Sequence, residues 1–399
     1  MRNEVVKFGN ASLSEDLPVS LVNIEDKTRS NLFTWRGQFS PQLIESLLSN
    51  YAKQDHVVFD PFLGSGTVLF ESALLGLKAL GCEINPAAVS FAKTYELANK
   101  PKKHIYHALE RVEEVISKYV NDLPLFQVES IENFETEILA MLSSEKDDVT
   151  NIILLAFITG LDFEIKKLDT KRINSVWKAL RANLESLPNS KKSLRCLHSD
   201  SRKTSLKSNS VDFVVTSPPY INVFNYHQNY RKSVEKIGFD VLAIAKSEIG
   251  SNRKFRQNRF LTVVQYCMDM SQVFCELNRI CKESSKIIFI VGRESNVRRT
   301  SFKNAKLITS VAITCGFKLE GEQERVFNNK FGESIFEEIL RFEIVENDIL
   351  NAIEESREIG ITALKEALLY CDTNVKDEIK EAIEKANKID VSPILNGQA

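Results

Sequence analysis

The stretch Asp60-Pro61-Phe62-Leu63-Gly64-Ser65-Gly66-Thr67 decides the fold class of this chain. It follows His56–Phe59, which reads as a short strand, and precedes Val68–Leu77, which reads as a helix. Gly64 and Gly66 permit positive φ and a close approach of the backbone to a ligand. A nicotinamide-dinucleotide fingerprint would need a third glycine, but Leu69 stands in its place. The pattern therefore predicts a strand, a glycine turn and a helix of an α/β sheet.

A second strand, Lys78–Asn85, follows that helix and carries the acid Glu83. Glu83 lies about 20 residues beyond the turn, where a carboxylate accepts the hydroxyls of a ribose. We therefore expect an adenosine-type ligand, with or without phosphate, beside the glycine turn.

The stretch Thr216-Ser217-Pro218-Pro219-Tyr220 closes the apolar run Val211–Val215, which reads as a buried strand. Its polar atoms are expected at the carboxyl end of that strand, where open α/β sheets bind ligands. Two prolines fix φ and remove two N–H donors, so neighbouring carbonyls are held rigidly as acceptors. Two acceptors followed by an aromatic ring suit a planar base that carries an exocyclic amine. A simple turn at a strand end is the alternative interpretation.

The two stretches together resemble the S-adenosylmethionine-dependent DNA amino-methyltransferases, which methylate the exocyclic nitrogen of cytosine or adenine. The resemblance implies a class I methyltransferase fold and a catalytic stretch made of Ser217, Pro218, Pro219 and Tyr220. It implies cofactor contacts from Asp60, Phe62, Gly64, Ser65, Gly66, Thr67, Glu83, Asn85, Asp200, Ser201 and Thr216. Within this set, Glu83 matches the acid that binds the ribose and Asp200 the acid that contacts the adenine.

The segment Trp35–Pro41 resembles the N-terminal cofactor-contacting segment of the same family. An equally good interpretation of these residues is a helix start, with Ser40 as the N-cap and Pro41 at the first helical position.

The chain organisation predicts a mostly parallel, Rossmann-like sheet that ends in an antiparallel hairpin, Phe317–Phe327 with Phe336–Ile344. We assign residues 1–96 and 195–345 to the catalytic domain and residues 346–399 to an acidic helical tail. Residues 97–194 form an all-helical insertion, because apolar residues recur there at helical spacing around 109–120, 152–161 and 173–184.

Basic residues gather directly after the Pro-Pro-Tyr motif. Between Ile221 and Phe260 there are eight basic and three acidic residues, a net charge of +5. The predicted nucleic-acid contacts are Arg231, Lys232, Arg253, Lys254, Arg256 and Arg259, and a solvated loop is the alternative. A second basic cluster follows a strand at 286–291: Arg293, Arg298, Arg299, Lys303 and Lys306. Only residues 201–215 separate Asp200 from Thr216, so we expect the helical insertion and the 221–260 segment to recognise the target.

Composition agrees with this interpretation. The 399-residue chain is 43% hydrophobic and carries a formal net charge of only −2, so nucleic-acid affinity must come from local patches. No apolar run reaches the roughly 18 residues of a membrane span, and the N-terminus lacks the pattern of a signal peptide. The seven cysteines form no Cys-x-x-Cys pair, and we expect neither a disulfide frame nor a metal. A cytoplasmic location in a bacterial or archaeal cell is the expectation.

The predicted function is methyl transfer from S-adenosylmethionine to a flipped-out base of double-stranded DNA. Cytosine N4 is favoured, because in the family a serine before Pro-Pro-Tyr goes more often with cytosine, and adenine N6 is the alternative. An RNA base methyltransferase, a nicotinamide-dependent oxidoreductase and a binding protein with a vestigial pocket stay open. The resemblance also implies a possible companion restriction endonuclease.

Overall fold

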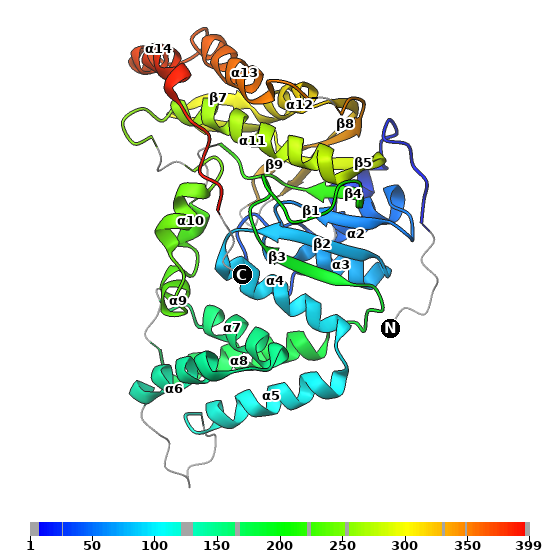
Figure 1. Cartoon of the computed structure of the whole chain (residues 1–399), viewed down its shortest axis with the longest axis vertical. Helices are drawn as coiled ribbons and strands as arrows, with labels where there is room; N and C mark the ends of the chain where they lie inside the picture. The colour runs from blue at the N-terminus through cyan, green and yellow to red at the C-terminus, as the bar shows by residue number, and fades with distance from the viewer. Residues whose placement is uncertain are drawn as a thin grey trace.

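The structure is a computed structural model that describes residues 8–25, 27–120, 131–163, 168–221, 225–251, 255–328, 332–347 and 349–395. A seven-stranded sheet forms its centre, in the order β3-β2-β1-β4-β5-β9-β8 (Figure 1). The strands are β1 (Val57–Asp60), β2 (Lys78–Glu83), β3 (Leu194–His198), β4 (Val211–Thr216), β5 (Cys281–Gly292), β8 (Phe317–Asn328) and β9 (Ser334–Ile344). Strands β1 to β5 pair in parallel, and β9 is antiparallel to both neighbours. The predicted sheet with its terminal hairpin is confirmed.

Apolar residues on both faces of the sheet build two cores. In β5, Ile288 and Ile290 belong to one core, whereas Ile287 and Phe289 belong to the other, because successive side chains of a strand point to opposite faces. The first face is covered by α2 (Pro41–Tyr51), α3 (Thr67–Leu75), α4 (Pro86–Ala92) and the 3-10 helix η1 (Lys93–Asn99). The second is covered by α11 (Leu261–Ile280) and α12 (Asn304–Thr314). Burial of both faces is typical of parallel sheets.

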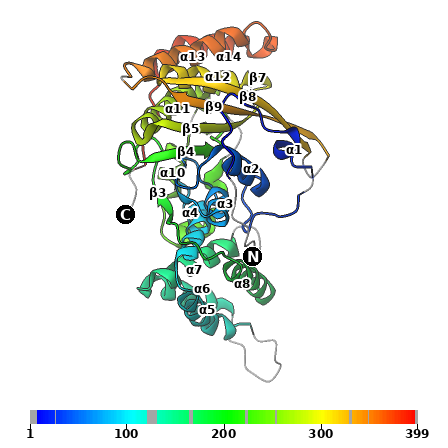
Figure 2. The same cartoon turned by 90° about the vertical axis from the view of Figure 1, so that its right-hand side faces the viewer.

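The segment between β2 and β3 continues, after η1, as α5 (Lys102–Ser117), α6 (Ile131–Ser144), α7 (Asp148–Leu161) and α8 (Thr170–Glu185). These helices lie together at one end of the molecule in both views (Figures 1 and 2). Two of these helices begin with an aspartate N-cap: Asp147 accepts a hydrogen bond from Thr150 N at 2.8 Å, and Asp169 accepts one from Arg172 N at 2.7 Å. Helix α7 contacts α4, which joins this lobe to the first core. The proposed domain division stays a prediction.

The acidic C-terminal segment is helical, with α13 (Ala352–Ala367), the short helix η3 (Thr373–Val375), α14 (Lys376–Lys385) and η4 (Ala386–Lys388). It lies at the end opposite the helical lobe (Figures 1 and 2). Helix α13 packs closely on α11, since a Cβ added at Gly360 would lie 2.7 Å from Val264 Cα. Leu364 and Ile379 are fully buried in the second core. The segment is therefore part of the core rather than a free tail.

Several short elements were not predicted. They are α1 (Val19–Asn23), η2 (Tyr226–Gln228), α9 (Arg231–Lys236), α10 (Val241–Ser247) and the hairpin of β6 (Glu294–Val297) and β7 (Thr300–Lys303). Helices this short depend on tertiary contacts rather than on local periodicity. Among the described helices, none has both the length and the apolar character needed to cross a membrane.

Candidate active site

The two sequence motifs meet at the carboxyl edge of the sheet. β1 ends at Asp60 and β4 ends at Thr216, and the two strands are parallel neighbours. Thr216 Oγ1 donates a hydrogen bond of 2.6 Å to Asp60 Oδ1. Both side chains are buried, and neither lines either of the two cavities that lie at this edge of the sheet. Their hydrogen bond therefore joins the two motifs beneath the surface of the site.

A first cavity of about 110 Å³ lies beside these motifs. Its lining includes most residues that were predicted to bind the cofactor: Phe62, Gly64, Ser65, Thr67, Glu83, Asn85, Asp200 and Ser201. The N-terminal segment that resembled a cofactor contact contributes Trp35, Arg36, Gly37, Gln38 and Phe39. Lining residues that the sequence did not indicate include Ile84, Ser199, Tyr226, Ser247, Glu248 and Ile249.

Glu83 is fixed at the end of β2 by backbone amides. Gly64 N donates to Glu83 Oε2 at 2.9 Å, and Asn85 N donates to Oε1 at 2.8 Å. Gly64 has a φ of 53°, which turns its N–H toward the acid. Burial raises the pKa of Glu83 to about 7, although these hydrogen bonds lower it. The acid thus holds the glycine turn and faces the cavity at the same time.

Ser65 and Thr67 hold the N-terminal segment against the glycine turn. Ser65 Oγ donates to Gln38 Oε1 at 2.9 Å, and Thr67 Oγ1 donates to Asn31 Oδ1 at 2.7 Å. Asn31 Nδ2 in turn donates to the Phe39 carbonyl at 2.7 Å. Both hydroxyls therefore have protein partners, and these bonds place residues 31–39 over the turn.

Gly66 serves packing and is not part of the cavity lining. Its φ is 97°, and an added Cβ would lie 2.7 Å from the ring of Tyr95 and 3.1 Å from Ala92 Cα. The missing side chain therefore lets the start of α3 approach α4 and η1. The sequence suggested a cofactor contact at this residue, but its local surroundings are Tyr95 and α4.

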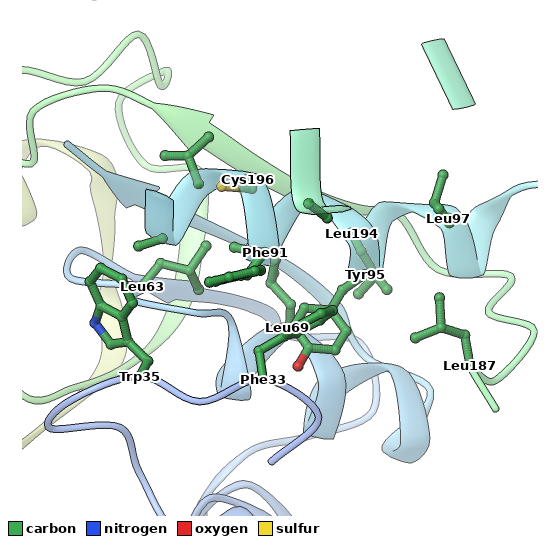
Figure 3. Packing of buried hydrophobic residues seen from close by; sticks show 14 of the residues in the cluster. Phe33, Trp35, Leu63, Leu69, Phe91, Tyr95, Leu97, Leu187, Leu194 and Cys196 are labelled. Atoms are coloured by element: carbon green, nitrogen blue, oxygen red, sulfur yellow. The ribbon is translucent and has the colours of Figure 1, made fainter. Parts of the chain in front are cut away.

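Aromatic residues of the N-terminal segment complete this wall. Trp35 and Leu63 lie near one another in Figure 3, and a Cβ at Gly64 would be 3.5 Å from the Trp35 ring. Phe33 stacks on Phe91 of α4 with ring centroids 4.9 Å apart.

Helix α2 begins at Pro41 after Ser40, as expected, but the Ser40 side chain makes no capping hydrogen bond. Ser40 is therefore the N-cap residue by position, as that interpretation expected, although its hydroxyl does not cap the helix.

Asp200 lines the first cavity, but its side chain is engaged elsewhere. Its Oδ1 accepts from Arg202 N at 3.0 Å and from Arg202 Nε at 2.9 Å. Its Oδ2 accepts from Arg202 Nη2 at 2.6 Å and from Leu395 N at 3.1 Å. The residue that was predicted to contact an adenine is thus bonded to the protein through both oxygens.

A second cavity of about 830 Å³ adjoins the first. The catalytic stretch contributes Ser217, Pro218 and Tyr220 to it, and the hairpin β8–β9 contributes Arg325, Phe327 and Glu337. Pro219 lines the first cavity instead. Ser217, Tyr226 and residues 37–39 line both cavities, so the two spaces meet around these residues.

Tyr220 is held against the end of β5. A Cβ added at Gly292 would lie 3.1 Å from the Tyr220 ring, and Tyr220 Oη is 3.4 Å from Ser217 Oγ. Burial raises the pKa of the Tyr220 phenol, which is therefore neutral. The ring and the serine hydroxyl of the catalytic stretch lie side by side at the second cavity.

Residues 225–251 contain η2, α9 and α10 where the sequence suggested a basic loop. His227 Nδ1 lies 2.6 Å from Glu248 Oε2, and both side chains are buried, which ties η2 to the end of α10. Arg231 pairs with Glu235 at 2.7 Å, whereas Lys232, Arg256 and Arg259 are exposed. The predicted contacts Arg253 and Lys254 lie outside the described residues.

Four of the five residues in the second basic cluster pair with acids. Arg298 lies 2.9 Å from Glu378, Lys303 lies 2.8 Å from Glu294, and Lys306 lies 2.7 Å from Glu366. Arg293 contacts Glu324 and Glu338. Because α13 and α14 supply two of these acids, the expected basic surface is largely neutralised.

Within the described ranges, no group of three or more His, Cys, Asp or Glu residues has the arrangement of a metal site.

Comparisons with known proteins identify relatives of this chain. A family model described as DNA methylase matches residues 11–94. Type II methyltransferase M.MjaII of Methanocaldococcus jannaschii is 20% identical over 449 residues, which cover 82% of this chain and 83% of the relative. Type II methyltransferase M.BsoBI of Geobacillus stearothermophilus is 21% identical over 347 residues, which cover 70% of this chain and 64% of the relative.

A solved SAM-dependent methyltransferase from Methanosarcina mazei shares 11% identity, covers 75% of this chain and 97% of its own, and has a TM-score of 0.34. The family match and the two relatives confirm the resemblance predicted from the motifs: the chain is related to the DNA amino-methyltransferases, whose cofactor is S-adenosylmethionine.

Proposed function

We propose that this protein transfers a methyl group from S-adenosylmethionine to the exocyclic amine of a base extruded from double-stranded DNA, with cytosine N4 as the target. The observation that carries the proposal is the meeting of two cavities at Ser217 and Tyr226. One cavity suits the methyl donor and the other the acceptor base, so the reacting atoms would approach one another at Ser217.

The first cavity fits an adenosine-type cofactor. Each carboxylate oxygen of Glu83 accepts one backbone N–H. Each oxygen can therefore accept a further hydrogen bond, which suits the two hydroxyls of a ribose. Trp35, Phe62 and Ile84 provide apolar surface around it. When bound, S-adenosylmethionine supplies a methyl group on a sulfonium, which is already a good leaving group, so positioning is the main task of the protein.

In the second cavity, the protein must activate the exocyclic amine of the base, which is a weak nucleophile. The lone pair of an exocyclic amine is delocalised into its ring, and hydrogen bonds from both N–H groups favour a tetrahedral nitrogen. Ser217 Oγ and the Pro218 carbonyl are the two acceptors that we assign to these N–H groups. Extruding the base requires a few kcal/mol, and stacking on Tyr220 offsets part of this at about 1 to 3 kcal/mol per base.

The polarity of the second cavity favours cytosine over adenine. Arg325 lines this cavity and is 4% exposed. Its Nε donates to the Val22 carbonyl at 2.6 Å, Nη1 contacts Glu337, and its guanidinium lies 4.3 Å from the ring of Phe327. Nη2 makes no hydrogen bond to any residue within the described part of the chain. A cytosine offers O2 to such a donor, whereas adenine has a C–H at the corresponding edge.

We assign Lys232, Arg256 and Arg259 to the phosphate backbone because they are exposed on the segment that follows the catalytic stretch. Arg253 and Lys254 belong to the same proposal, and Arg231 joins it if DNA competes with Glu235. Target recognition falls to helices α5–α8 together with residues 221–260. A companion restriction endonuclease is part of the proposal, because the two relatives are named Type II methyltransferases.

The test is nucleoside mass spectrometry of DNA and RNA incubated with the purified chain and S-adenosylmethionine. N4-methylcytosine in DNA is the expected product. If N6-methyladenine forms instead, the target base is adenine. Methylation confined to RNA would contradict the proposal. A chain that binds a nicotinamide dinucleotide but not S-adenosylmethionine in calorimetry would favour the oxidoreductase interpretation.

A further inference from the structure

Arg202 is a buried guanidinium at which separate segments of the chain meet behind the first cavity. Its side chain is 0% exposed, and it contacts Asp200 through Nε and Nη2. Nη2 also lies 3.2 Å from the Ser247 carbonyl. Asp200 and Ser247 both line the first cavity. Arg202 therefore joins two walls of that cavity without reaching into it.

The end of the described chain completes this cluster. Arg202 Nη1 donates to the Ser392 carbonyl at 2.7 Å, and Nη2 donates to the Pro393 carbonyl at 2.9 Å. Asp269 of α11 accepts from Ser392 N at 2.7 Å and from Ser392 Oγ, and it lies 3.5 Å from Arg202. Leu395 N donates to Asp200 Oδ2 at 3.1 Å. Residues 392–395 thus supply acceptors and donors to three buried charged side chains.

Asp200 has little capacity left for a ligand. An ionised carboxylate offers about four acceptor positions, and Arg202 and Leu395 fill two on each oxygen. The acid is therefore better suited to hold the loop Ser199–Ser201 in place than to bond an adenine amino group directly. Its orientation depends on a segment that lies 195 positions further along the chain.

We propose that Ser392–Leu395 is a positioning element of the cofactor site, whose docking and S-adenosylmethionine binding favour one another. The inference rests on the proposed function, since it takes the first cavity as the cofactor site. Removing the segment would leave Arg202 without two acceptors and Asp269 without two donors in a buried cluster. Unsatisfied buried charges are strongly unfavourable, so Asp200 and Ser247 would move to recover partners and the cavity wall would be lost.

Two changes test this by calorimetry with S-adenosylmethionine. A chain that ends at residue 390 removes the whole segment, and Ser392→Ala removes one hydrogen bond to Asp269. We expect the Kd and the KM for the cofactor to rise about tenfold or more in the truncated chain and severalfold in Ser392→Ala. In both variants, the kcat at saturating cofactor and the KM for DNA should stay within about twofold of the wild-type values. Ser392→Thr should bind the cofactor as the wild type does, because it keeps the hydroxyl.

Asn278→Ala is the matched control. Asn278 lies on the same helix as Asp269 and makes two hydrogen bonds, a buried one to the Cys315 carbonyl at 3.0 Å and a partly buried one to the Glu346 carbonyl at 2.8 Å. Its loss should lower the melting temperature but leave the cofactor Kd unchanged. A wild-type Kd in a folded truncated chain would overturn the inference, and tighter binding would show competition between the segment and the cofactor instead.

Hydrogen exchange on the full-length chain covers the case in which the truncated chain does not fold. Because coupling between two sites is reciprocal, S-adenosylmethionine should increase the protection of the Ser392 and Leu395 amides. Unchanged protection at saturating cofactor would contradict the inference. If the full-length chain does not bind S-adenosylmethionine at all, the proposed function fails, which is a separate outcome.

Discussion

Thr216 and Asp60, which are 156 positions apart, share a buried hydrogen bond of 2.6 Å between Thr216 Oγ1 and Asp60 Oδ1. Burial raises the pKa of Asp60 to about 7, while Thr216 and the Phe62 amide lower it. The bond fixes the glycine turn relative to the Pro-Pro-Tyr stretch. The geometry of the two cavities therefore depends on the hydrogen bond between Thr216 and Asp60, although neither residue lines a cavity.

Replacing Thr216 with Val should separate the two motifs. The change keeps the shape of the side chain but removes one of the two donors to Asp60 Oδ1, and the Phe62 amide remains at 3.0 Å. Loss of this buried hydrogen bond should lower the free energy of unfolding by about 1–3 kcal/mol. Urea denaturation measures the loss, and Thr216→Ser, which keeps the hydroxyl, should recover most of it. Equal stability of the Val and Ser variants would mean that the hydrogen bond contributes nothing.

Cofactor binding should strengthen as the pH rises toward neutrality. Burial raises the pKa of Glu83 from 4.5 to about 7, and only the ionised acid accepts two ribose hydroxyls. The Kd for S-adenosylmethionine should therefore fall between pH 6 and pH 8, by about tenfold for a pKa near 7, and then level off. Glu83→Gln should bind weakly with no such dependence. A pH-independent wild-type Kd would remove Glu83 from this role.

Ser217→Ala and Tyr220→Ala should lose methylation while they keep cofactor binding. Ser217 Oγ would accept an amine N–H in the transition state, and loss of one such bond typically lowers kcat roughly 100-fold. Tyr220→Ala removes the stacking surface, whereas Tyr220→Phe keeps it and should stay active. Methyl transfer assays with parallel calorimetry separate the two effects. Full activity of both alanine variants would contradict the assignment of the base site.

Gly66→Ala should reduce stability rather than remove a cofactor contact. The new Cβ would lie 2.7 Å from the Tyr95 ring at a φ of 97°. Gly76→Ala is the control, because Gly76 has a φ of 70° with nothing within 4 Å of an added Cβ. That control isolates the backbone strain, roughly 1 kcal/mol. We expect a larger loss at Gly66 in thermal unfolding, and equal losses would exclude a steric role for Tyr95.

Arg325→Met should lower cytosine methylation by about tenfold, since a base hydrogen bond to a charged donor contributes roughly 1–3 kcal/mol. The cofactor Kd should stay unchanged, because Arg325 does not line the first cavity. Arg325→Lys keeps a donor and should recover part of the activity. Nucleoside mass spectrometry provides the readout, and an unchanged N4-methylcytosine yield would remove Arg325 from base selection.

The local motifs were predictable because they depend on residues close together in the chain. Short continuous apolar runs indicated the strands, Gly64 and the Pro218-Pro219 pair marked the turns after β1 and β4, and the spacing to Glu83 placed an acid at the end of β2. Parallel neighbouring strands then bring these turns to one edge, so most of the first cavity follows from the sequence.

Only the tertiary structure decided which distant partners these residues have. Nothing near Gly66 in the sequence indicates Tyr95 against it, and no local pattern places Ser247 in the cavity wall or Leu395 on Asp200. Backbone preferences and apolar periodicity act over a few residues, whereas hydrogen bonds across hundreds of positions depend on how the helices pack. The sequence therefore determined the sheet and the chemistry at its edge, and the packing determined which acids and hydroxyls stay available for a ligand.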